Sequence, residues 1–272
     1  MTGASPHGKL KAMSSSFSLL TWNVNSIRVR LDHVLGYLDE HEPDVVCLQE
    51  TRVEDRLFPR VPFMELGYQV HLNGTKGYAG VATLTKRKTQ RVQQGFAEAP
   101  ADKHRRILRV EIEDTVIYNL YAPNGTALDS DNFPYKLAWY AQLRAELDAI
   151  SQEKNILVCG DFNVILDARD VWDPEAFAGK LHCTREEKQA LQNLIDVGLH
   201  DCFRKREQGA GHFTFFDYQH HRWEKREGMR IDHIYASPAL FSRCQSVLHD
   251  ESVRELDGPS DHLPVLGHFS KS

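Results

Sequence analysis

The stretch NILVCGDFN, residues 155–163, contains the two features that decide the fold. Four consecutive apolar residues predict a short strand that is buried on both faces. Gly160 then begins a turn that places the polar residues Asp161 and Asn163 directly after this strand. The same pattern, a short apolar run that ends in polar residues, recurs along the chain. It predicts sheets whose strand ends carry carboxylates, amides and histidines.

Further strands and the helices between them follow from the same reading of apolar spacing. Strands are expected at 17–23, 44–50, 80–86, 107–113, 115–122, 229–237 and 265–269. Helices are expected at 28–40 and 133–150, and a third opens at Thr184, which forms a capping box with Glu187. Many strands with a few intercalated helices predict an α/β fold with four layers, α/β/β/α. Two packed, mainly antiparallel sheets would be flanked by helices.

Length and composition favour one large domain. The chain has 272 residues, of which 41% are apolar, and no Pro- or Gly-rich linker divides it. We expect one domain over residues 17–272, and a disordered extension over residues 1–16, which are rich in Ser, Gly and Lys. We also expect a monomer.

Cysteine usage and hydropathy predict a cytoplasmic protein. The five cysteines form no CxxC pair, and most lie within apolar runs, which is typical of reduced thiols in a reducing compartment. No apolar run approaches the ~18 residues of a membrane span. Residues 1–16 lack the apolar stretch of a secretory signal.

The overall negative charge is unfavourable for a nucleic-acid partner. The formal net charge is -5, whereas Lys and Arg usually supply most of the non-specific affinity for phosphate. A carboxylate cluster that binds a cation is itself negative, however, and basic residues can gather elsewhere. Basic groups occur at 86–88, 103–106 and 204–206, and in the loop with Arg222, Lys225, Arg226 and Arg230. Each of them alone is more commonly a solvated face.

The polar residues at the strand ends are the candidate site. They are Asn23 and Asn25, Glu50, Tyr121 with Asn124, Asp161 and Asn163, Asp232, and Asp261 with His262. Carboxylate and amide oxygens at one rim of a sheet are the ligands that Mg²⁺ prefers. Taken singly, each has a structural alternative: Glu50 can simply end a strand, Asp161 can stabilise a turn, and His262 can be a structural histidine.

The order of these segments is more specific than any one of them. The chain resembles the exonuclease III and abasic-endonuclease branch of the endonuclease/exonuclease/phosphatase superfamily from about residue 17 to its end. The motifs that carry the resemblance are TWNVNSIRVRL at 21–31, PDVVCLQET at 43–51, GVATLTK at 80–86, YAPNG at 121–125, GDFN at 160–163, FTFFDY at 213–218, RIDHIYAS at 230–237 and PSDHLPV at 259–265.

The resemblance implies a divalent-metal-dependent DNA repair nuclease. Such an enzyme hydrolyses phosphodiesters by in-line attack of water and leaves a 3'-hydroxyl and a 5'-phosphate. Its activities would be 3'-to-5' exonuclease, 3'-phosphatase or abasic-site endonuclease. The expected partner is double-stranded DNA with abasic sites or with blocked or recessed 3' ends.

The resemblance also implies catalytic roles. Asp161 matches the residue that positions or deprotonates the attacking water, and Asn163 would hold the phosphate or the water. His262 matches the histidine that donates to a phosphate oxygen, and Asp232 would orient its ring and favour its protonated form. Tyr121 would donate a hydrogen bond to a phosphoryl oxygen.

The implied metal is Mg²⁺, with Mn²⁺ as a possible substitute. Glu50 matches the principal ligand, and Asn23, Asn25 and Asp261 would surround the same ion. Asn25 departs from some relatives, which place an aspartate there, so this site would carry one negative charge fewer.

The substrate residues implied by the resemblance are Asn124, Phe215, Met229 and His182. Phe215 and Met229 align with the apolar pocket that receives a base-less sugar, although relatives commonly have Trp and Leu there; both side chains can equally be core. His182 lies in the segment 171–183, which resembles a subgroup where this loop lies near the DNA. We expect His182 to disfavour internal abasic sites and to favour 3' ends.

Two other functions remain open at this point. The same residues would serve a phosphoesterase of this fold that acts on inositol phosphates or lipids, because fold alone does not choose a substrate. The other is a non-catalytic regulator that keeps the fold, but every catalytic position is filled here.

Overall fold

Two sheets form the centre of the molecule. The computed structural model describes residues 16–97, 105–151 and 154–270. Within these residues, the strands form two six-stranded sheets, in the orders β11-β12-β1-β2-β4-β3 and β5-β6-β7-β8-β10-β9. Residues 1–15 of the expected extension lie outside the described residues, and Ser16 begins β1.

Both sheets are mainly antiparallel, as predicted. The first contains β1 (Ser16–Asn23), β2 (Val45–Gln49), β3 (Gln69–Asn73), β4 (Val81–Thr85), β11 (Cys244–His249) and β12 (Val265–Ser270). The second contains β5 (Arg91–Gln94), β6 (Ile107–Ile112), β7 (Thr115–Tyr121), β8 (Asn155–Asp161), β9 (His200–Asp201) and β10 (Asp232–Ala236). Only β1 with β2 and β7 with β8 pair in parallel among the described strands.

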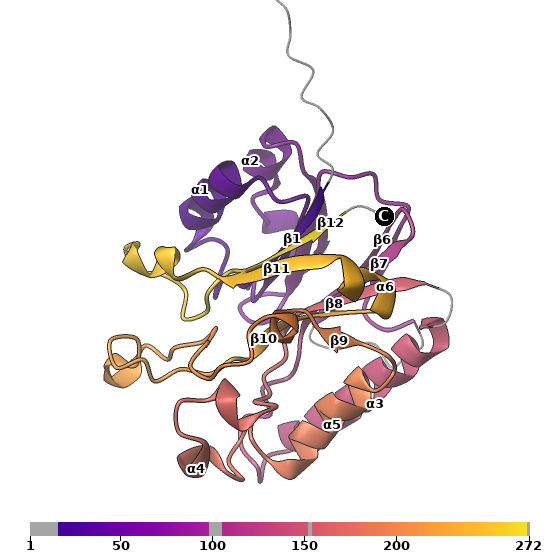
Figure 1. Ribbon diagram of the computed structural model, residues 1–272. Coiled ribbons are helices and arrows are strands. Elements are labelled where there is room, and N and C mark those ends of the chain that lie inside the picture. Colours follow the sequence, from indigo (N-terminus) through magenta and orange to yellow (C-terminus); the bar gives the residue numbers. More distant parts are fainter. Residues whose placement is uncertain (1–15, 98–104, 152–153, 271–272) are drawn as a thin grey trace, which may run out of the picture.

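Helices cover the outer face of each sheet, so the expected α/β/β/α sandwich is confirmed. Helices α1 (Leu31–His41) and α2 (Arg60–Glu65) lie on the first sheet, and α3 (Asn132–Ile150) and α5 (Arg185–Ile195) lie on the second (Figure 1). The shorter helical segments are α4 (Pro174–Phe177), α6 (Pro238–Arg243), η1 (Asp55–Leu57), η2 (Ala168–Asp170), η3 (Phe203–Lys205), η4 (Gln219–His221) and η5 (Glu251–Glu255).

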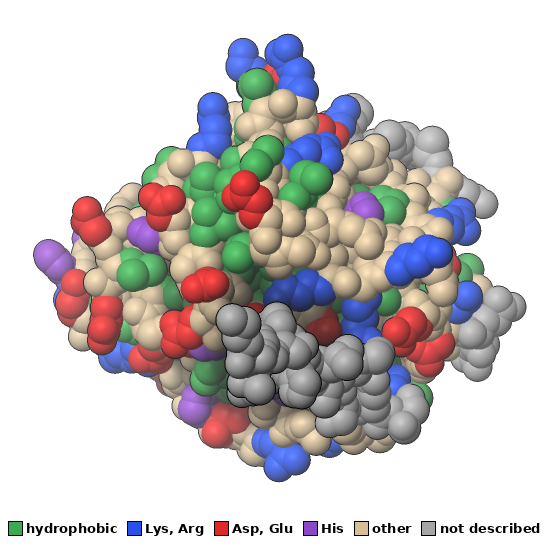
Figure 2. All heavy atoms as spheres, turned by 90° about the horizontal axis from the view of Figure 1, so that it is seen from above, with side chains coloured by type: hydrophobic (Ala, Val, Ile, Leu, Met, Phe, Trp, Pro, Cys, Tyr) green, Lys and Arg blue, Asp and Glu red, His purple; other side chains and the backbone are tan. Residues whose placement is uncertain are grey.

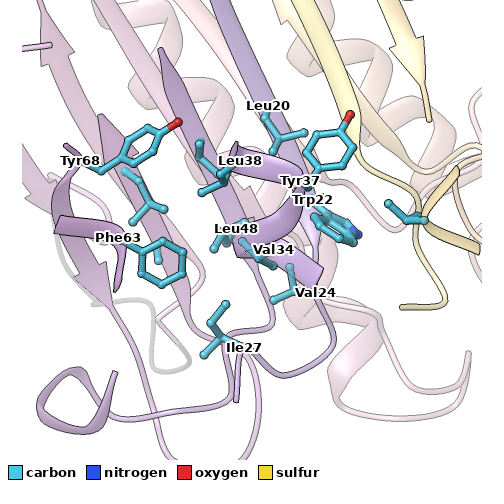
Figure 3. Packing of buried hydrophobic residues seen from close by; sticks show 14 of the residues in the cluster. Leu20, Trp22, Val24, Ile27, Val34, Tyr37, Leu38, Leu48, Phe63 and Tyr68 are labelled. Atoms are coloured by element: carbon cyan, nitrogen blue, oxygen red, sulfur yellow. The ribbon is translucent and has the colours of Figure 1, made fainter. Parts of the chain in front are cut away.

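The apolar spacing of α1 explains its place. Val34 and Leu38 lie on its buried face and point toward Trp22 and Leu48 of the sheet beneath (Figure 3). Burial of each such side chain contributes about 1.5–3 kcal/mol. A separate cluster, which includes Leu19 of the first sheet, fills the space between the two sheets and holds them face to face.

The start of α5 was predicted correctly in detail. The Thr184 side chain accepts from the Glu187 main chain, and the Glu187 side chain accepts from the Thr184 main chain. Each cap satisfies a main-chain donor that the helix itself leaves unpaired.

The strands that the sequence did not predict are β3, β5, β9 and β11. They are the outer strands of the two sheets. An outer strand is paired on one side only and tolerates polar, exposed residues, so its apolar pattern is weak. β5, for example, has the sequence RVQQ and is largely exposed. β10 is also shorter than expected, because 229–231 lie before the strand.

Basic residues lie beside acidic ones at several places in the molecule. On the face seen in Figure 2, which α1 and α2 cover, Lys and Arg side chains lie among acidic and apolar ones. Arg230 is buried, and its Nε and Nη2 atoms lie 2.7 Å from carboxylate oxygens of Asp170 and Asp201. Arg226 pairs with Glu251. Several of the expected basic residues therefore serve internal ion pairs.

Candidate active site

Strand register brings the predicted residues to one end of the sandwich. Asp161, the last residue of β8, lies opposite Tyr121 of β7 on one side and Asp232 of β10 on the other. In the first sheet Asn23, the last residue of β1, lies beside the end of β2, which Glu50 follows. Because the two sheets pack face to face, their polar strand ends meet.

Amide hydrogen bonds connect the acidic residues across the two sheets. Asn23 Nδ2 donates to Glu50 Oε1 and to Asp161 Oδ2, each at 3.0 Å. Asn25 Nδ2 donates to Asp261 Oδ1 at 3.0 Å, and the Asn25 main chain donates to Asn23 Oδ1. The four residues expected around a metal therefore belong to one hydrogen-bonded group.

His262 is held by Asp232. Its Nδ1 lies 2.8 Å from Asp232 Oδ2, and its Nε2 lies 3.8 Å from Asp161 Oδ2. Thr214 Oγ1 donates to the same Asp232 oxygen at 2.7 Å. Burial opposes the charged imidazolium, but Asp232 and Asp161 outweigh it and raise the pKa of His262 to about 10. The ring is therefore protonated at neutral pH in the absence of a metal.

The donors for a divalent cation are the carboxylates. Ligand atoms of Glu50, Asp161 and His262 lie within 4.8 Å of one another. Nδ1 of His262 is already hydrogen-bonded to Asp232, so only Nε2 faces Asp161. The oxygen atoms of Glu50, Asp161 and the surrounding amides suit a hard cation such as Mg²⁺ or Mn²⁺.

The two central carboxylates differ in acidity. Burial raises the pKa of Asp161 to about 7, with His262 opposing and Asp232 and Glu50 adding to the rise. Burial also disfavours the charge of Glu50, but Asn23 and an ion pair with Arg52 outweigh it and lower its pKa. Glu50 is thus a permanent anion, whereas Asp161 can exchange a proton near neutral pH.

Several site residues adopt left-handed backbone conformations. The φ angles are 44° at Asn25, 49° at Glu50, 51° at Asn163 and 70° at His182. Non-glycine residues in this region cost about 1 kcal/mol or more each and persist only where the surroundings hold them. Other non-glycine residues of the described chain share this conformation, so it does not by itself mark the site.

Tyr121 and two asparagines line the same end. Burial, Glu50 and Asp161 keep the pKa of Tyr121 well above its usual value, so its hydroxyl remains a donor. Asn163 Nδ2 donates to the Ala122 carbonyl at 3.0 Å, and its main chain donates to Asp161 Oδ1 at 2.9 Å. Asn124 Nδ2 approaches Asn163 Oδ1 at 3.4 Å.

The expected substrate residues also lie here. The ring centroids of Phe215 and His262 are 4.9 Å apart. The Phe215 main chain forms isolated antiparallel β-bridges with His262 and with Met229. Phe215 and Met229 are half-buried against a small apolar cluster that includes Val171 and Ile231. They are neither fully core nor fully exposed, as the wall of an apolar pocket requires.

His182 contacts the same group from the segment before α5. Its Nδ1 lies 2.7 Å from the Asn163 carbonyl oxygen, which fixes the proton on Nδ1. Its Nε2 then accepts from Asn124 Nδ2 at 3.4 Å. Burial, followed by the nearby Lys136, lowers the pKa of His182 to about 4, so this ring is neutral.

Lys136 was missed in the sequence, and Glu187 was expected only as part of a capping box; both lie behind Asn163 and are fully buried. A signal for Lys136 was present in α3. It precedes Tyr140, Leu143 and Leu147 at helical spacing and so lies on the buried stripe, where a lysine needs partners.

Buried carboxylates, a protonated histidine and a polar rim suit the hydrolysis of phosphate esters. A family model described as the Endonuclease/Exonuclease/phosphatase family matches residues 20–262. The chain belongs to this family.

Relatives place the chain more narrowly. It is 33% identical over 263 residues to an exodeoxyribonuclease III of Haemophilus influenzae, and the match covers 92% of this chain and 98% of that one. A 3' phosphatase from Neisseria, NExo, solved with a product DNA hairpin, is 36% identical at a TM-score of 0.90, over 93% of this chain and 99% of that one. An AP endonuclease from Archaeoglobus fulgidus is 35% identical at a TM-score of 0.87, over 93% and 99%.

These relatives place the chain in the exonuclease III and AP endonuclease group of DNA repair nucleases. None of the helices in the described part of the chain combines the length and apolar character of a membrane span.

Proposed function

We propose that the protein is a magnesium-dependent DNA phosphodiesterase that acts at damaged or blocked 3' ends and at abasic sites. The observation that carries the proposal is the buried arrangement in which His262 lies between Asp161 and Asp232. The proposal also takes residues 17–272 as one catalytic domain.

Asp161 supplies the base. Its pKa of about 7 lets it accept a proton from the attacking water at neutral pH. The Asn163 main chain holds one carboxylate oxygen, which leaves the other toward His262 and Asn23.

Protonated His262 and the Tyr121 hydroxyl stabilise the negative charge that builds on the phosphate oxygens. Such fixed donors are usually the largest catalytic contribution. Asn163 and Asn124 present side-chain amides to the same phosphate.

The metal site would comprise Glu50 with Asn23, Asn25 and Asp261 around it. A bound divalent cation stabilises the negative charge of the phosphate during hydrolysis. The permanent charge on Glu50 fits this role.

The substrate preference rests on Phe215, Met229 and His182. The apolar pair forms a wall beside His262 that suits a base-less sugar. The His182 ring, hydrogen-bonded to Asn163 and Asn124, favours a frayed 3' end over an internal abasic site. The DNA-processing relatives support a nuclease over an inositol-phosphate or lipid phosphoesterase.

The test uses purified protein, Mg²⁺ and labelled duplexes with an internal abasic site, a recessed 3' end or a 3'-phosphate. We expect cleavage of the 3'-blocked and recessed duplexes to exceed abasic incision, and EDTA to stop all three. Activity that survives EDTA, or that appears only on a phosphoinositide or sphingomyelin control, would overturn the proposal.

A further inference from the structure

A buried lysine lies behind the candidate active site. Lys136 belongs to α3, and its side chain is completely inaccessible. Its ammonium has three hydrogen-bond partners: the carbonyl oxygen of Asn163 at 2.7 Å, that of Asn124 at 3.2 Å, and Glu187 Oε1. An ammonium group has three donors, so each one is used.

The carboxylate of Glu187 neutralises the charge of Lys136, and both of its oxygens accept hydrogen bonds. Oε1 accepts from Lys136 and from the His182 main chain at 3.0 Å. Oε2 accepts from the Thr184 main chain at 3.1 Å and from Thr184 Oγ1 at 2.8 Å. A buried charge pair of this kind persists because its remaining hydrogen-bonding sites are occupied.

Stability alone does not account for the pair. Replacement of a buried ion pair by well-packed apolar residues is often neutral or stabilising. The packing of α3 and α5 against the second sheet is already apolar, through residues such as Leu143 and Leu191. The lysine instead binds the main chain of two residues whose side chains line the candidate active site.

The contact of Lys136 with Asn163 restrains the main chain of Asn163. Asn163 has a left-handed backbone with a φ of 51°, a conformation that asparagine tolerates better than most residues. Its carbonyl oxygen receives both Lys136 Nζ and His182 Nδ1, each at 2.7 Å. These two hydrogen bonds fix the orientation of the Asn163 side chain. They also fix its main-chain N–H, which donates to Asp161.

We infer that Lys136 is a positioning residue for hydrolysis: with Glu187 it fixes the main chain of Asn163 and Asn124, and so aims their side chains at the phosphate. The inference rests on the function proposed above. It adds a residue of α3 that touches no substrate but sets the geometry of two residues that do.

The test removes the pair as a unit, because Lys136→Met alone would leave a buried, unpaired carboxylate. In Lys136→Met/Glu187→Gln the glutamine keeps a capping-box residue type. We expect kcat on the 3'-phosphate duplex to fall about 10- to 100-fold, since small misplacements of reacting groups cost that much. KM should change by less than about threefold, because the DNA contacts stay.

Lys205→Met is the matched control. Lys205 Nζ also donates to three main-chain carbonyls, those of Phe241, Ser242 and Cys244, at 2.7–2.9 Å. These residues lie at the end of α6, beyond the far end of β10 from Asp232. Its loss should lower the melting temperature and leave kcat unchanged.

The outcomes separate the inference from the function on which it rests. A wild-type protein without metal-dependent cleavage overturns both. An active wild type and a folded double variant with kcat within about twofold of it overturn the inference alone. If the double variant does not fold, Lys136→Gln/Glu187→Gln, which keeps a neutral hydrogen-bonded pair, is judged by the same kcat criterion.

Discussion

The surroundings of His262 and of His182 differ in charge, although both rings contact the residues that end β8. His262 lies 3.8 Å from the Asp161 carboxylate and is paired with Asp232. His182 lies 2.7 Å from the Asn163 carbonyl oxygen, which Lys136 also binds. Both rings experience desolvation, which favours the neutral form.

The charge nearby decides the outcome for each ring. Two carboxylates raise the pKa of His262 to about 10, whereas burial and then Lys136 lower that of His182 to about 4. One end of the sandwich thus holds a charged donor and a neutral ring. The charged His262 suits the stabilisation of negative charge during the reaction. The neutral His182 suits a structural role in the site.

The largest expected effect comes from Asp161→Asn, which removes both the proposed base and a carboxylate beside His262. We expect cleavage to fall about 10³-fold or more, since a positioned base contributes roughly 10²- to 10⁴-fold. Binding of a 3'-phosphate duplex, measured by fluorescence anisotropy, should persist. A rate near that of the wild type would remove Asp161 from the mechanism.

Asp232→Asn should have the next largest effect, because it takes away the closest partner of His262. We expect the rate to fall about 10²-fold and the pKa of His262, followed by NMR without metal, to move from about 10 toward its usual value. Thr214→Val, which removes the hydroxyl that donates to the Asp232 carboxylate and accepts from the main chains of Ile231 and Asp232, serves as a milder comparison. An unchanged His262 titration would contradict the assignment.

The opposite shift at His182 predicts a loss of stability in acid. The folded pKa of about 4 lies below the unfolded value of 6.5, so the unfolded chain binds the proton more readily between them. His182 therefore stabilises the fold fully above pH 6.5 and progressively less below it, with a loss of about 3 kcal/mol at pH 4. Urea unfolding at several pH values checks this. Relative to the wild type, His182→Gln should flatten the curve, and parallel curves would exclude His182 as the cause.

The smallest effect concerns selectivity. His182→Gly removes the ring and suits the φ of 70° at this position. We expect the ratio of abasic incision to 3'-end removal to rise about tenfold, measured on matched duplexes in one reaction. An unchanged ratio would show that this ring does not select the substrate.

Buried elements were predicted from the sequence better than exposed ones. The inner strands and the start of α5 were expected because buried strands and capping boxes leave strong local patterns. The outer strands β3, β5, β9 and β11 were not, since half-exposed strands carry mixed residues. The network of Lys136 and Glu187 was also missed, because Glu187 reads as a helix cap and its partner Lys136 lies 51 residues away.

The sequence by itself determined the inner strands, the sandwich architecture and the set of polar residues at the strand ends, because each leaves a signal within a few neighbouring residues. Only the tertiary structure decided which charged groups lie next to each of these residues. Asp232 and His262 are 30 residues apart, and Lys136 and Glu187 are 51 apart. Protonation depends on distances of a few ångströms in a medium of low dielectric constant, and those distances exist only once the two sheets have packed.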